Sequence, residues 1–306
     1  MLSILKYFSS VKSVVGMEIN SSYIKLVELR GSFKNCELIG LQKIDLPLGI
    51  IDDGKIIDQK NFIKLLKEIV EEQSWQGKQI AIAINSSKIK VIPIYLPLMP
   101  QTELKNAVSW ELQKLIDFEE KEIVFDYICF GKTQVEDNEK MLILAAIVPK
   151  LISIQYYNTF QSVGLKLTTL DIIPCALCRT FPWPPNDFNI YAIIDIGNER
   201  AVFCLVSENK LLLTKTINFT DIKIIPSNLQ LLINELKGSL KFLGKTVKKI
   251  ILTGERSNLP GLIEFLNIEL DIDVELGNPL VGILAANDFL DPSFSVAGGL
   301  ALRGLN

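Results

Sequence analysis

The sequence of 306 residues contains no histidine. This absence excludes serine–histidine and cysteine–histidine catalysis and every metal site that needs an imidazole ligand. It also removes the side chain that most often changes charge near neutral pH. An excess of positive charge is missing too, because 32 Lys and Arg residues stand against 35 Asp and Glu residues. Without a broad basic surface, nucleic acid is not an expected partner.

Long apolar runs are also missing. No stretch approaches the ~20 apolar residues that a transmembrane helix needs. Residues 1–13 have Lys6 inside a short apolar run and lack the cleavage site of a secretory signal, so we expect an N-terminal tail. The protein is therefore expected to be soluble and cytoplasmic.

The number of cysteines is odd, which favours a reducing compartment over a disulfide framework. The five are Cys36, Cys129, Cys175, Cys178 and Cys204. Two of them have C-x-x-C spacing, but no second pair completes a four-thiolate zinc site. We interpret them as structural thiols, with redox or metal chemistry as the alternative.

The first half of the chain alternates short apolar strands with amphipathic helices. The patterns predict strands at 14–19, 23–29, 37–46 and 79–84, with a helix at 58–73 before the last of them. A small α+β module is then predicted, with strand 88–96, a helix at 103–117 capped by Thr102, and strands 122–130 and 141–148 around a polar loop. A helix at 150–163, a strand at 165–170 and a helix from Pro174 lead to an extended linker at 182–186.

The second half repeats the opening pattern. Strands are predicted at 190–196, 201–206, 210–217 and 249–252, and helices at 227–243, 260–268 and 295–304. Each half starts with an apolar strand that contains an acid, then a small polar turn and a returning strand. The two acids, Glu18 and Asp195, are 177 residues apart, since 195 minus 18 is 177. Two copies of one β-β-β-α-β unit across a cleft predict an actin-like, duplicated α/β fold.

Turns between buried strands can direct backbone N–H groups at a phosphate, and an acid at the strand end can hold Mg²⁺. The second turn fits this chemistry well, with Asp195 as the metal candidate beside Gly197 and Asn198. The first turn fits less well, since Glu18 is longer than Asp and Asn20 stands where Gly would admit phosphate. Its remaining candidate donors are Ser21, Ser22 and Lys25. A tight hairpin without a ligand is the alternative for both turns.

A third turn follows the predicted strand at 249–252 and contains Gly254, Glu255 and Arg256. An adenosine would lie here in an actin-like protein, beside the N-terminus of the next helix. The bulky charged side chains indicate a crowded or altered site. An ordinary strand-to-helix turn is the alternative.

Six segments in order resemble the PilM family of type IV pilus assembly proteins, relatives of the cell-division protein FtsA. The segments are 15–29, 46–56, 94–111, 171–177, 253–262 and 296–305. The resemblance implies an actin-like protein that binds ATP with Mg²⁺ and holds the N-terminal cytoplasmic tail of a PilN-like membrane protein. It also implies contacts with the pilus platform and motor proteins at the inner face of the cytoplasmic membrane, and a possible homo-oligomer.

The resemblance also implies a division of the chain. The first actin-like lobe would comprise 14–87, 160–182 and 295–306, the inserted 1C-type subdomain 88–159, and the second lobe 183–294. Only 218–228 separates the last strand of the second hairpin from the long helix, so the family's 2B region is expected to be reduced. Glu235 on that helix matches a family position near the ribose.

The chain departs from the family pattern at several nucleotide positions. Glu18 replaces Asp, Asn20 replaces Gly, Ile173 replaces a carboxylate that faces the cleft, and Glu255 replaces Gly. We therefore expect a scaffold with a degenerate ATP site, no assigned catalytic residue and at most weak ATPase activity. The alternative is an active actin-like ATPase or small-molecule kinase. A filament former like FtsA would need a membrane helix after the final helix, and a GspL-like protein would need a downstream transmembrane helix. The given sequence stops at Asn306, directly after the predicted final helix, so we expect neither class.

The expected partner site lies between the first lobe and the inserted module. The segment entering the module is unusually apolar, and we predict that Ile94, Tyr95, Leu96 and Leu98 contact the PilN-like tail. The alternative is that this segment packs under the helix at 103–117. The acidic run 117–122 could steer a basic tail.

Overall fold

The computed structural model describes residues 12–33, 35–116, 122–135, 138–181, 190–207, 210–219, 226–243, 247–281 and 290–305. The first half contains β1 (Ser13–Ile19), β2 (Tyr23–Ser32), β3 (Asn35–Asp45), β4 (Ile51–Asp52), β5 (Lys55–Ile56), α1 (Gln59–Glu72), β6 (Gln79–Ile84), β7 (Lys90–Pro97), α2 (Gln101–Leu115), β8 (Ile123–Val135), β9 (Asn138–Pro149), α3 (Lys150–Ser162), β10 (Lys166–Asp171) and α4 (Ile173–Thr180). The second half contains β11 (Ile190–Ile196), β12 (Arg200–Ser207), β13 (Lys210–Asn218), α5 (Pro226–Leu243), β14 (Val247–Thr253), α6 (Leu262–Leu270), β15 (Asp273–Leu276), the short helix η3 (Pro292–Phe294) and α7 (Ser295–Leu305).

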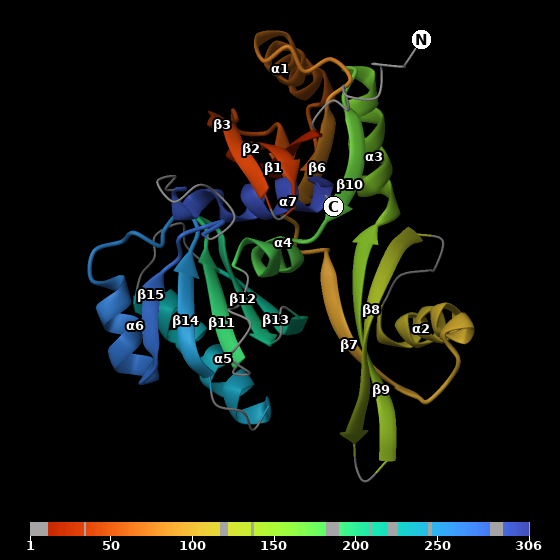
Figure 1. The fold of residues 1–306 in the computed structure, drawn as a ribbon, viewed down its shortest axis with the longest axis vertical. Helices are drawn as coiled ribbons and strands as arrows, with labels where there is room; N and C mark the ends of the chain where they lie inside the picture. Colours follow the sequence, from red (N-terminus) through yellow and green to blue (C-terminus); the bar gives the residue numbers. More distant parts are fainter. Residues whose placement is uncertain are drawn as a thin grey trace, which may run out of the picture.

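Two five-stranded sheets have the same strand order, which confirms the predicted duplication. The first runs β10-β6-β1-β2-β3 and the second runs β15-β14-β11-β12-β13. In both, the first strand of the unit pairs antiparallel with the second and parallel with the strand after the helix. Figure 1 shows the sheets as two lobes, with α4 and α7 between them. The fold is therefore the duplicated actin-like α/β architecture.

The final helix packs back onto the first lobe. α7 runs across β1, β2 and β6 and also contacts α4 (Figure 1). Gly16 of β1 makes this approach possible, because a Cβ there would lie 1.9 Å from the carbonyl oxygen of Ala297. Buried side chains of α4 and α7 form one apolar cluster with both sheets, including Ile173, Ile193 and Leu300. This cluster holds the lobes together and lies on the face of the first sheet opposite α1 and α3.

The inserted module is a three-stranded antiparallel sheet in the order β7-β9-β8, with α2 on one face (Figure 1). Its order of elements agrees with the prediction, but two details were wrong. Thr102 lies inside α2, whose N-cap is Pro100 without a side-chain cap bond. The polar segment between β8 and β9 is mostly strand, because the two strands stay paired as far as Val135 and Asn138.

Some other predictions fall outside the described residues or were incomplete. The sequence patterns missed β15 and the small β4–β5 hairpin. The linker at 182–186, residues 1–11 of the tail and most of the acidic run at 117–122 lie outside the described residues. No helix in the described part of the chain is long and apolar enough to cross a membrane.

Candidate functional site

The two predicted phosphate turns and the third turn meet between the lobes. Glu18 and Lys25 are directly opposite each other on β1 and β2, and Asp195 stands near the end of β11. Glu255 reaches them from the turn after β14. The tertiary structure thus brings together charged groups that lie up to 237 positions apart, since 255 minus 18 is 237.

Glu255 binds two lysines from the other lobe. Its carboxylate forms an ion pair with Lys25 and another, at 2.5 Å, with Lys43. The Lys25 side chain is only 1% exposed, donates a further hydrogen bond of 2.8 Å to the carbonyl of Ser293, and lies over the ring of Tyr23. The buried cation is therefore already compensated by groups of the protein itself.

Burial controls the ionisation of the surrounding carboxyl groups. Desolvation raises the pKa of Glu18 to about 8, with repulsion from Asp195 and Glu255 adding to it and Lys25 opposing it. Desolvation likewise raises the pKa of Asp195 to about 6. Desolvation also disfavours ionisation of Glu255, but the hydrogen bonds from Lys25 and Lys43 outweigh it and lower its pKa. Glu255 is thus the carboxylate that carries the charge facing Lys25.

The predicted donors of the first and second turns also bind protein atoms. Ser21 Oγ donates to the Glu199 carboxylate at 2.5 Å, and the Asn20 side chain accepts from the backbone N–H of Ser21 at 2.6 Å. Asn198 accepts from Arg256 Nε at 2.8 Å. The Gly197 amide donates to the carbonyl of Arg200 at 2.9 Å, which closes the second hairpin. These contacts favour the ligand-free hairpin for both turns.

The third turn lies directly against β11. Gly254 has φ +97°, and a Cβ there would be 2.5 Å from the Asp195 carboxylate. A glycine is therefore required, and the close approach leaves Glu255 aimed at the lysines. The cleft enclosed by these groups has a volume of about 10 Å³. A pocket for a drug-sized ligand has roughly 300–1,000 Å³, and even one water needs about 10–15 Å³.

The residues present do not fit Mg-ATP in this arrangement. Nucleotide phosphates would have to displace Glu255, and the carboxylates would add repulsion in a desolvated site. Ile173 lines the cleft where the family pattern has a carboxylate. Within the described residues no group of three or more Asp, Glu, Cys or His side chains is arranged to hold a metal ion.

Like Ser21 and Asn198, the predicted site residues Ser22 and Glu235 do not line the cleft. Glu235 on α5 does not line the cleft, and its carboxylate forms an exposed ion pair with Lys215 of β13 at 2.5 Å. Ser22 contributes a backbone carbonyl that accepts from the Leu46 amide at 2.9 Å, which joins the first hairpin to the end of β3. Arg200 lines the cleft and was not predicted. The available signal was a lone arginine at the start of an otherwise apolar strand.

Three of the predicted partner residues lie on β7, where they divide between the two faces of the module sheet, and Leu98 follows that strand. Ile94 and Leu96 are 4% and 3% exposed and pack against α2, so they belong to the module core and cannot contact a partner without unpacking it. The alternative interpretation is correct for these two. Tyr95 and Leu98 are 44% and 45% exposed and stay available.

A groove of about 370 Å³ lies between the module sheet and the first lobe. Its walls come from β7, β8 and β9 on one side and from α3, β10, α4 and α7 on the other. Large apolar side chains in it are half exposed, among them Val124 at 48% and Ile128 at 50%. Sequence reasoning missed these two, although their alternation along the strand was a usable signal.

Comparisons with known proteins agree with this architecture. The family described as "Type IV pilus assembly protein PilM" matches residues 16–225, which is more than half of the chain. A solved "PilM-PilN type IV pilus biogenesis complex" contains a similar chain, with a TM-score of 0.80, 24% identity, and coverage of 96% of this chain and 98% of that one. No curated protein sequence matches significantly.

More distant solved structures share the fold alone. The ethanolamine utilization protein EutJ from Carboxydothermus hydrogenoformans has a TM-score of 0.54 and 14% identity, with 95% of this chain and 89% of that chain covered. A Bacteroides thetaiotaomicron protein described as having an actin-like ATPase fold has a TM-score of 0.53 and 11% identity, with 98% of both chains covered.

Proposed function

The chain belongs to the PilM family of type IV pilus assembly proteins, and we propose that it is a scaffold that binds the cytoplasmic tail of a PilN-like membrane protein without needing nucleotide. The observation that carries this proposal is the half-exposed apolar groove between the module sheet and the first lobe. The related chain of the "PilM-PilN type IV pilus biogenesis complex" supports the choice of partner. Binding such a tail would recruit the protein to the inner face of the cytoplasmic membrane.

The groove suits a short segment with apolar side chains. The exposed face of the module sheet offers Val124 and Ile128, and Asp171 and Arg179 of the first lobe form an ion pair at the opposite wall. Apolar anchors between charged rims are the usual composition of a peptide site. Tyr95, on the same face of β7, extends the apolar surface toward the far end of the module.

A degenerate nucleotide site is the second part of the proposal. The Glu255 carboxylate occupies the space between the hairpins and compensates Lys25, so lobe closure does not depend on phosphate. The alternative of an active ATPase or kinase lacks support, since the cleft has no room for phosphates and Ile173 offers no base. The division into two lobes, an inserted 1C-type module and a reduced 2B region remains part of the proposal.

The test is binding of a synthetic PilN-like N-terminal peptide to the full chain, measured by calorimetry without nucleotide. We expect micromolar affinity or better, weakening with salt, and a loss of about tenfold or more for Ile128→Glu, because a charge then enters the apolar groove. Tyr95→Ala should weaken binding less.

The matched control is Ile268→Glu, since Ile268 is an 80% exposed isoleucine on α6 in the other lobe. Its affinity for the peptide should equal that of the unchanged protein. Equal affinity of the Ile128→Glu and Ile268→Glu variants for the peptide would refute the groove as its binding site. If no PilN-like peptide bound the unchanged protein, the proposed partner would be wrong.

A further inference from the structure

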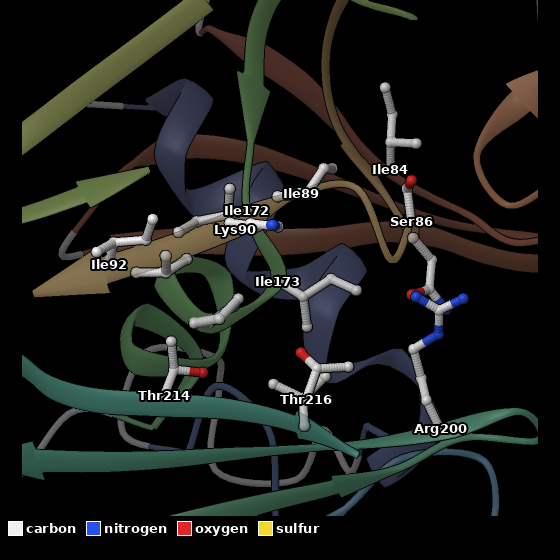
Figure 2. Close-up of a pocket in the computed structure, with 14 residues that line it drawn as sticks. Ile84, Ser86, Ile89, Lys90, Ile92, Ile172, Ile173, Arg200, Thr214 and Thr216 are labelled. Atoms are coloured by element: carbon white, nitrogen blue, oxygen red, sulfur yellow. The ribbon is translucent and has the colours of Figure 1, made fainter. Parts of the chain in front are cut away.

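A second cavity between the lobes adjoins the filled cleft and has a volume of about 260 Å³. Asn85, Ile173, Arg200 and Val202 line both spaces. It lies where the base of the module, the start of α4 and strands β12 and β13 meet. Figure 2 shows Arg200 rising from β12 toward Ser86, with Ile173 and Thr216 beside the same space. The cavity is open enough for a small molecule, whereas the neighbouring cleft is closed.

Arg200 is the unusual group of this cavity. The residue is 8% exposed, yet its Nε and Nη1 have no hydrogen-bond partner among the described residues. Its Nη2 is 3.4 Å from the Asp53 carboxylate, which is a long contact for a charged pair. That carboxylate already accepts short bonds from the amide and hydroxyl of Ser87, at 2.7 and 2.6 Å.

A buried guanidinium with two unmet N–H groups is costly, because each donor has lost water without gaining an acceptor. The other buried cation between the lobes, Lys25, has a carboxylate and a carbonyl as partners. Lys90 also lines the cavity and adds a second positive charge (Figure 2). The local balance therefore favours an anion, and the planar fork of an arginine matches two oxygens of a carboxylate or phosphate.

We propose that this cavity binds a small oxyanion with an apolar portion, held by Arg200 and Lys90 and turned with its apolar part toward Ile173 and Val202. The volume is below the roughly 300–1,000 Å³ of a drug-sized pocket, so the ligand is fragment-sized. Ser86 and Thr216 supply hydroxyl groups beside the anion. The site goes beyond the scaffold function, because Arg200 does not line the partner groove. Arg200 also lines the filled cleft, but no group there accepts from its Nε or Nη1.

The experiment measures thermal unfolding of the full chain with increasing concentrations of four sodium salts at constant ionic strength. Phosphate and AMP represent phosphate oxyanions, acetate and hexanoate represent carboxylates, and chloride replaces each as the reference. We expect saturable stabilisation over chloride, larger for hexanoate than for acetate because the walls are apolar. The two pairs distinguish a phosphate ligand from a carboxylate ligand.

Substitutions at Arg200 and Thr216 locate the site. Arg200→Met should weaken the anion response by about tenfold or more, and Arg200→Lys should weaken it less, since an ammonium keeps the charge but lacks the fork. Thr216 is exposed on β13, so Thr216→Trp should block the cavity without disturbing the core. Lys210→Trp, exposed on the same strand and outside the cavity, is the matched control and should respond as the unchanged protein does.

The proposal is overturned if none of the four anions stabilises the unchanged protein more than chloride. It is also overturned if the Thr216→Trp variant responds as strongly as Lys210→Trp. The comparison of Thr216→Trp with Lys210→Trp tests the site even if Arg200→Met does not fold. Peptide binding in the groove should be unaffected by Thr216→Trp, which keeps this test independent of the scaffold function.

Discussion

Single buried charges set the chemistry of the inter-lobe cleft. Glu18 is 6% exposed, and burial raises its pKa to about 8 from an ordinary value of 4.5. Between these values the folded protein holds a proton on Glu18 that the unfolded chain has released. The folded state then binds more protons, so the free energy of unfolding falls as pH rises from about 4.5 to 8. Asp195, whose pKa burial raises to about 6, makes a contribution of the same sign, so it too lowers the free energy of unfolding as the pH rises to about 6.

Replacing Glu18 with Gln should remove its part of this pH dependence. Glutamine keeps the size of the side chain and cannot ionise. We therefore expect the free energy of unfolding of the variant to exceed that of the unchanged protein by about 1–3 kcal/mol at pH 8, and to differ little from it near pH 5. Urea unfolding from pH 5 to 8.5 measures the difference. Glu37→Gln, which changes an exposed ion pair with Arg30, is the control and should stay within about 0.5 kcal/mol. An unchanged pH slope in Glu18→Gln would contradict the assignment.

At the scale of elements, the contact between β1 and α7 depends on a missing side chain. A Cβ on Gly16 would lie 1.9 Å from the Ala297 carbonyl and 2.4 Å from the Ala301 amide, and neither backbone atom can move without shifting the helix. Gly16→Ala should therefore lower the free energy of unfolding by about 2–4 kcal/mol. Gly40→Ala on β3 is the matched control, since nothing lies within 4 Å of its added Cβ, and should change stability by less than about 1 kcal/mol. If Gly16→Ala and Gly40→Ala lowered the free energy of unfolding by similar amounts, the close contact of β1 with α7 would not be what requires glycine at position 16.

For the whole molecule, lobe closure should not respond to nucleotide. Lys25, Lys43 and Ser21 of the first lobe bind Glu255 and Glu199 of the second, so the lobes are already joined where a phosphate would join them. We expect Mg-ATP to leave hydrogen exchange in β1, β2, β11 and β12 unchanged. Glu255→Ala should speed exchange there and cost about 2–4 kcal/mol, because Lys25 stays buried without a carboxylate.

The control for Glu255→Ala is Glu139→Ala, which removes the same charge from an exposed pair with Lys132 in the module. Its stability should change by less than about 0.5 kcal/mol, with no change of exchange at either hairpin. Slower exchange of the hairpins in the unchanged protein on addition of Mg-ATP would mean that the nucleotide site is functional.

The sequence by itself determined the elements and their duplication. Apolar periodicity and turn residues are local, so β1, β2, β11 and β12, the long helices and the small-residue final helix were predictable within a few residues. The acidic positions Glu18 and Asp195 were found for the same reason, since each ends an apolar run. The resemblance of six ordered segments indicated the family, and residues 16–225 match it.

Only the tertiary structure decided what those side chains do. Glu255 meets Lys25, 230 positions away in the sequence, because the two lobes pack together, which no local pattern encodes. The pleat of β7 decided that Ile94 and Leu96 face α2, and sheet order decided that Val124 and Ile128 face the groove. Arg200 is short of partners because Asp53 is already engaged by Ser87. Long-range packing and desolvation, rather than residue type, thus fix which of the predicted polar groups stay free to bind a ligand.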